Sequence, residues 1–166
     1  MTRRTVTLLT PHALDQVRTR LSAAIDHPLN LTGARPALGR VGPYTAWLYQ
    51  RRPINNAFQT VFSLVLEPQD ERQGDGVILH GVSDIGAFGR LLLGLMTLML
   101  VGVAIMARHE LGAASAIPWL IAGAGAVGVG LIYAVGRAMA AGEHDFLVRF
   151  LIQTLDARVI QTPRDD

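Results

Sequence analysis

Arginine and asparagine gather in one short stretch, "WLYQRRPINNAF", at residues 47–58. Guanidinium groups hold anions through forked N–H donors, so Arg51 and Arg52 could contact a lipid phosphate, another ligand or an acidic side chain. Asn55 and Asn56 favour a turn, because asparagine tolerates left-handed backbone angles. We assign these four residues as the candidate ligand or phosphate contact.

The simplest interpretation of this stretch is a turn between two strands whose arginines pair locally. Asp70 and Glu71, in the next polar connection, are the expected acidic partners. Trp47 and Tyr49 alternate along the preceding strand and should share one face of a sheet. The open alternatives are a membrane phosphate and a specific ligand held in a cleft.

Other polar patterns predict no catalytic residue, no metal and no cofactor. "GEHD", at 142–145, holds three possible metal ligands in a row, but adjacent helical residues point in different directions. We interpret it as a helix start with acidic residues in its first turn. "RHEL", at 108–111, lacks the second histidine of a zinc-protease motif, because position 113 is alanine.

Two charge-free runs dominate the 166-residue chain, at 91–107 and 111–136. A helix needs about 20 apolar residues to cross a bilayer. A chain this short has too little other sequence to bury two all-apolar helices, which argues against a soluble protein. The sequence therefore predicts a transmembrane helical hairpin over 86–140, with spans at about 87–107 and 118–137.

The spans have the composition of an anchor. Thr97 and Tyr133 are polar groups inside them, and neither span has an ionisable residue at its centre. Pumps and pores place such groups at mid-membrane, so a transporter is not indicated. Ser83 or Asp84 is expected to cap the first span.

Small residues recur every four positions along the second span, which lets helix backbones approach closely in lipid. The stripe could pack on the first span, the interpretation we favour, or on a second copy of the chain. Its members are Ala122, Ala126, Gly130, Ala134 and Ala138.

Residues 1–85 predict an α+β domain of order β-α-β-β-β. Thr10 and Pro11 are typical of a helix start, with a hydroxyl N-cap and proline at the first helical position. The three later strands, joined by polar turns, predict an antiparallel meander. The elements are a strand at 4–9, a helix at 11–26, a loop at 27–36 and strands at 43–50, 57–67 and 77–82.

Residues 141–160 contain an amphipathic helix, and residues 161–166 are expected to be a disordered tail. The helix is expected to dock on the α+β domain. The bilayer surface and a partner protein are the alternatives.

Arginine placement predicts the orientation. Arg90, Arg137 and Arg149 lie on the domain side of the spans, against Arg108 at the hairpin tip. The first twenty residues also lack the apolar core of a signal peptide. We expect a protein of the bacterial inner (cytoplasmic) membrane, with both termini cytoplasmic.

The layout resembles a group of short bacterial two-transmembrane-helix proteins with no assigned function. The resemblance rests on "RVG" at 40–42, the strand and turn that follow, "NAF" at 56–58, and the membrane hairpin. Members often read "R-N-S-F" at the turn, where this chain has Asn55 in place of the arginine. The resemblance implies a layout and no activity.

These observations favour a membrane-anchored interaction or assembly module rather than an enzyme. Expected partners are the lipid bilayer and either a second copy or a membrane protein. A net charge of +2 does not indicate nucleic-acid binding. The alternative is a membrane-tethered ligand sensor or enzyme using a cleft near Arg51 and Arg52.

Overall fold

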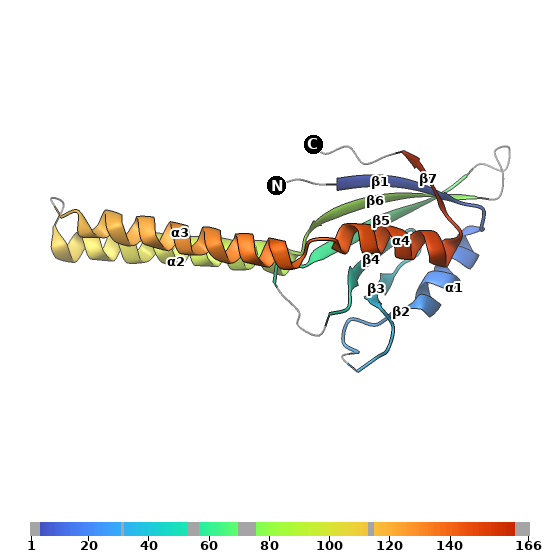
Figure 1. Cartoon of the computed structure of the whole chain (residues 1–166), viewed down its shortest axis with the longest axis horizontal. Helices are drawn as coiled ribbons and strands as arrows, with labels where there is room; N and C mark the ends of the chain where they lie inside the picture. Colours follow the sequence, from blue (N-terminus) through green and yellow to red (C-terminus); the bar gives the residue numbers. More distant parts are fainter. Residues whose placement is uncertain (1–3, 31, 53–56, 70–75, 113–114, 162–166) are drawn as a thin grey trace. The chain divides into compact units, whose positions relative to one another are not determined.

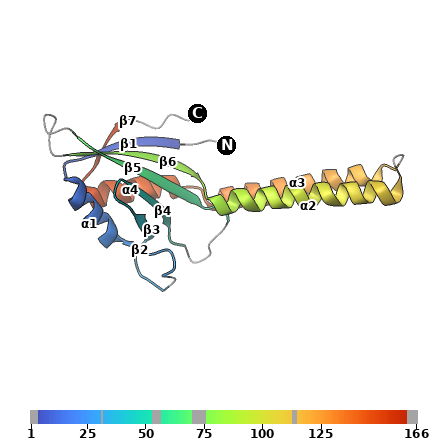
Figure 2. The ribbon, with the colours of Figure 1, turned by 180° about the vertical axis from the view of Figure 1, so that it is seen from behind.

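The computed structural model describes residues 4–30, 32–52, 57–69, 76–112 and 115–161. The chain forms two compact units, which are described separately (Figures 1 and 2). The α+β unit comprises 1–55, 60–84 and 142–166, and the hairpin unit comprises 56–59 and 85–141.

The α+β unit contains a seven-stranded mixed sheet. Its strands lie in the order β2-β3-β4-β5-β6-β1-β7. β2 and β3 pair in parallel, whereas β1 pairs antiparallel with both β6 and β7, and β4 antiparallel with both β3 and β5. The strands are β1 (Arg4–Thr10), β2 (Ile25–Asp26), β3 (Ala37–Val41), β4 (Thr45–Gln50), β5 (Thr60–Pro68), β6 (Val77–Ile85) and β7 (Arg158–Gln161).

Three of these strands, β2, β3 and β7, were not among the strands of the predicted β-α-β-β-β order. β3 contains Gly39, where a Cβ atom would collide with the carbonyl oxygen of Trp47 on β4. Residues 37–41 were left unassigned from the sequence, and glycine inside a strand is typical of such a close backbone approach. The expected meander is confirmed in its order, because β4, β5 and β6 are neighbours in the sheet.

Two helices, α1 (Leu14–Ala24) and α4 (Glu143–Leu155), cover one face of the sheet (Figures 1 and 2). The apolar side chains of both helices interdigitate with the inward face of the strands. Docking of the C-terminal helix on the α+β domain is therefore confirmed. The largest fully buried side chains include Phe62, Leu8, Leu21, Leu48, Leu64, Leu79, Leu147, Leu151 and Leu155.

The predicted start of the first helix is wrong. α1 begins at Leu14, and its N-cap residue Ala13 makes no side-chain capping bond. Thr10 instead ends β1, and its buried hydroxyl donates to the carbonyl oxygen of Leu155, 2.6 Å away. This long-range bond satisfies a carbonyl at the end of α4, so tertiary contact wins over the local capping pattern.

The hairpin unit contains α2 (Ala87–Leu111) and α3 (Ile117–Met139), both long and apolar enough to cross a membrane. Their large side chains are mostly exposed, including Leu98, Met106, Trp119 and Val127. The expected cap of α2 by Ser83 or Asp84 is wrong, because its N-cap is Gly86 and no side chain caps it.

The two hairpin helices approach each other closely at Gly125. A Cβ atom there would collide with the side chain of Leu100. Phe58 packs edge-on against Tyr133, with ring centroids 5.9 Å apart, and lies against the backbone of Gly136. Phe58 therefore belongs to the hairpin unit and not to the strand predicted at 57–67, since β5 begins at Thr60.

Candidate functional site

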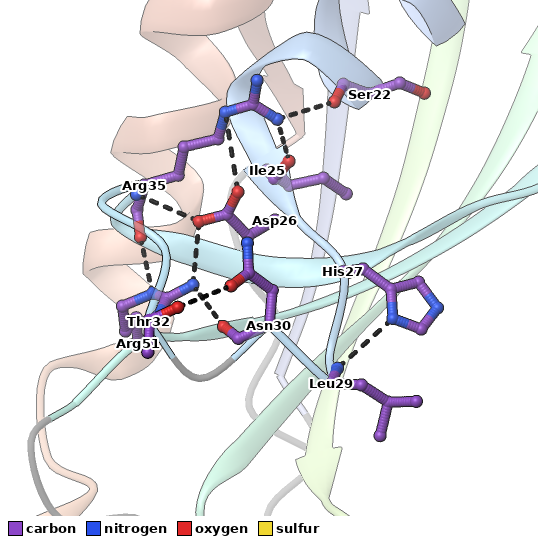
Figure 3. A network of polar contacts seen from close by, with 9 residues as sticks. All are labelled: Ser22, Ile25, Asp26, His27, Leu29, Asn30, Thr32, Arg35 and Arg51. Carbon is purple, nitrogen blue, oxygen red and sulfur yellow. Dashed lines mark hydrogen bonds and ion pairs between the residues drawn. The ribbon is translucent and has the colours of Figure 1, made fainter.

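Arg51 is held at the end of β4 by Asp26 of β2 (Figure 3). Its Nη2 donates to Asp26 Oδ2 at 2.8 Å and to the carbonyl of Asn30 at 2.9 Å. Its Nε donates to the carbonyl of Arg35 at 2.9 Å. The side chains of Arg51 and Asp26 are only 17% and 12% exposed, so this fork is a partly buried part of the fold.

Arg35 completes this network from the loop that follows β2 (Figure 3). Its backbone N–H donates to Asp26 Oδ2 at 3.2 Å, and its Nη1 donates to the carbonyls of Ser22 and Ile25 at the end of α1. Gly33 lets the loop close on the carboxylate, because a Cβ atom there would overlap Asp26 Oδ2. One carboxylate thus organises the whole loop.

The network defines what Arg51 can do chemically. Its donors are directed at a carboxylate and at two backbone carbonyls, which is how a guanidinium closes a loop. Such an arrangement needs no external anion to satisfy it. Arg51 as a ligand or phosphate contact therefore stays a prediction that would require these bonds to exchange.

Arg52 pairs with a different acidic residue, Glu143. Its Nε lies 3.1 Å from Oε1 of Glu143, the first residue of α4, whose side chain is fully buried. The other carboxylate oxygen, Oε2, accepts the backbone N–H of Thr60 at 2.6 Å. The two neighbouring arginines thus pair with acids that lie far apart in the sequence, Arg51 with Asp26 and Arg52 with Glu143. The expected partners Asp70 and Glu71 lie outside the described residues.

A second buried polar contact lies beside Glu143. Oγ of Ser83, near the end of β6, is hydrogen-bonded to Nδ1 of His144 at 2.5 Å, and both residues are buried. The imidazole also lies against the ring of Phe62, with ring centroids 5.8 Å apart. A serine bonded to an imidazole resembles half of a nucleophile pair, but burial closes this one to a substrate.

The opening stretch forms a strand as expected. Trp47 and Tyr49 stack in parallel on one face of β4, with centroids 6.0 Å apart. Burial raises the pKa of the Tyr49 phenol, and the charge of Arg51 acts against that shift. Asn55 and Asn56, the other half of the candidate contact, lie outside the described residues.

The small-residue stripe lies mostly on the exposed side of α3. Ala122 is partly buried, and the other four members are exposed. At Gly130 a Cβ atom would meet nothing within 4 Å, whereas the contact with α2 is made at Gly125. Packing of the stripe on α2, the interpretation favoured from the sequence, stays a prediction. Packing on a second chain also stays a prediction.

Sequence reasoning missed the residues that give these arginines their environment. Asp26 was assigned to the end of the predicted helix at 11–26 but lies in β2, Arg35 lies in the predicted loop at 27–36, and "GEHD" was interpreted as a helix start only. α4 does begin there, yet Glu143 and His144 also reach across to β5 and β6. The sequence did carry one signal for this. Glu143 and His144 follow directly after the apolar hairpin, where the chain returns to the α+β unit and that unit can bury polar side chains.

Within the ranges that the structure describes, no group of three or more His, Asp or Glu side chains could hold a metal ion. The polar side chains of Arg51, Arg52, Ser83 and Glu143 contact other side chains or backbone groups of the α+β unit. No family model, curated protein or solved structure matches the chain.

Proposed function

We propose that the protein is a membrane-anchored interaction module of the bacterial inner membrane. In this proposal α2 and α3 cross the bilayer as a hairpin, and the α+β unit lies in the cytoplasm with both termini. The observation that carries it is the exposure of most large apolar side chains of two long helices, outside the face on which the helices contact each other. In water such a surface would aggregate, whereas in lipid it is the ordinary state.

Binding rather than turnover is favoured by the polar contacts of the α+β unit. Arg51 and Arg52 are engaged with Asp26 and Glu143 inside the fold. The stacked Trp47–Tyr49 pair lies on the sheet face opposite the helices, where aromatic side chains are typical of contact surfaces. The exposed stripe on α3 offers a second route to assembly, between hairpins in lipid.

Membrane anchorage is tested by one charge at the middle of α2. Leu98→Arg places a cation on an exposed apolar helix, at a cost of about 2.5–3.5 kcal/mol for insertion. We expect the ratio of carbonate-resistant to carbonate-extracted protein to fall by about a hundredfold for the variant relative to the wild type. Val65→Arg, on the exposed face of β5, is the matched control and should stay in the membrane fraction.

Two results would count against the proposed function. Full extraction of the wild-type protein by carbonate would exclude the anchor. Purification in mild detergent that yields only monomer, with no partner protein, would exclude the interaction role while leaving the anchor intact.

A further inference from the structure

Five polar residues of the α+β unit lie beside the points where the chain leaves and re-enters that unit. The crossings fall at 55/56, 59/60, 84/85 and 141/142. At most three residues separate each crossing from a member of this set, which we name the α4 polar cluster. Its members are Arg52, Thr60, Ser83, Glu143 and His144.

The cluster joins these crossings to one another. Glu143 links the residues on either side of the first connection, because it pairs with Arg52 and accepts the N–H of Thr60. His144 bonds Ser83, the residue just before the chain enters the hairpin unit. Along the chain, α2 begins four residues after Ser83, and α3 ends four residues before Glu143.

Stability alone does not explain why buried charged and polar residues form this cluster. Burying a charged pair costs desolvation, and well-packed apolar residues of the same volume would hold two elements equally well. Glu143 is fully buried, but the Arg52 side chain is 29% exposed. The paired atoms Arg52 Nε and Glu143 Oε1 are themselves buried, so water solvates both groups only once the first turn of α4 moves.

The remainder of α4 is held differently. Leu147, Leu151 and Leu155 are fully buried in the core, so the later turns stay docked by apolar contact. Gly142, just before the helix, has a φ of +82° and offers no side-chain cap. The first turn can thus open, as a local event below global unfolding, at the cost of its polar contacts, the contact of His144 with Phe62 and the packing of the partly buried Phe146.

We propose that the first turn of α4 is a conformational switch, closed by the α4 polar cluster and biased by the state of the membrane hairpin. The coupling to the bilayer rests on the anchorage proposed above. When the turn opens, the Thr60 amide, the Ser83 hydroxyl and the His144 ring become accessible to solvent. The switch would report tilt or strain of the hairpin to the strand ends of the α+β unit.

Hydrogen exchange on the full chain in detergent micelles tests the switch without a bilayer. Glu143→Gln keeps the acceptor for Thr60 but removes the charge that pairs with Arg52. We expect about tenfold faster exchange in the first turn of α4 and at Thr60, with the last turn of α4 unchanged. Uniformly faster exchange along α4, or no change at all, would overturn the proposal.

Asp156→Asn is the matched control, because Asp156 binds His12 and Arg20 at the other end of the helix. It should loosen the C-terminal end and leave the first turn protected. The same loosening of the first turn by both variants would mean that α4 undocks as one body, and the switch would be excluded.

Hydrogen exchange of the wild-type chain in vesicles tests the coupling to the membrane and needs no variant. Short-chain and long-chain phosphatidylcholine bilayers impose different tilt on a spanning hairpin. We expect protection of the first turn of α4 to change severalfold between them, with the last turn constant. Protein that floats with both vesicles but shows identical exchange excludes the coupling alone. Protein that does not float excludes the anchor as well.

Discussion

Two consecutive helices, α3 and α4, differ in where their large apolar side chains lie. α3 exposes Trp119, Leu120 and Val127 by 67%, 69% and 72%, and contacts its neighbour through glycine. α4 buries three leucines on one side and faces water on the other. The difference shows that a low exposed fraction is a sign of good packing for α4 but not for α3. For α3 the proposed solvent is lipid, and exposure there is compatible with stability.

The largest expected effect contrasts one leucine from each helix. Leu151→Ala removes a fully buried side chain and should lower the free energy of unfolding of the α+β unit by about 2–5 kcal/mol. Leu120→Ala, on an exposed face of α3, should change it by less than about 0.5 kcal/mol. Denaturant unfolding in micelles measures both values.

Trp47 fluorescence reports this unfolding when Trp119, the other of the two tryptophans, is changed to phenylalanine in every variant. Equal losses from the two leucine variants would break the comparison, because α3 would then share a core with the α+β unit.

The next effect separates two glycines of α3. Gly125→Ile should strain the hairpin by about 1–3 kcal/mol, because the new side chain meets Leu100 of α2. Gly130→Ile should leave the single chain unchanged, since a Cβ atom there meets nothing within 4 Å. Thermal unfolding in micelles measures the first difference.

Self-association of the same two variants tests the exposed stripe. If the stripe binds a second copy, energy transfer between labelled chains diluted in micelles should fall for Gly130→Ile more than for Gly125→Ile. Equal transfer for the wild type and Gly130→Ile would exclude the stripe as a contact between chains.

The sequence predicted best where one local property decides the structure. Freedom from charge over two long runs predicted both hairpin helices, and period-two alternation predicted β1, β4, β5 and β6. Leucine and phenylalanine spacing likewise predicted the buried side of α4. These patterns need no knowledge of what lies across the fold.

The missed features all depend on a distant partner. β7 is four residues long and exists because β1 offers it an open edge. Thr10 was expected to cap a helix, yet it bonds a residue 145 positions away. Asp26 and Glu143 could not be matched with Arg51 and Arg52 by spacing, because the topology brings them together. Sequence separation hides such pairs even when each residue type is suggestive.

The smallest expected effect concerns the exposed C-terminal end of α4. Asp156 adopts a left-handed φ of 49° and accepts bonds from His12 at 3.0 Å and Arg20 at 2.9 Å. These hydrogen bonds hold the pKa of Asp156 below its ordinary value of 3.8. Because the folded pKa lies below the unfolded one, folding is favoured by the ionised carboxylate.

The stabilisation by Asp156 should therefore be fully present above the unfolded pKa, near pH 4, and fade as the pH falls through the lower folded value. A double-mutant cycle with Arg20→Gln and Asp156→Asn, followed by unfolding at several pH values, isolates the pair. The coupling should be small, constant near neutral pH and lost in acid. Coupling that grows on acidification would contradict the assigned sign.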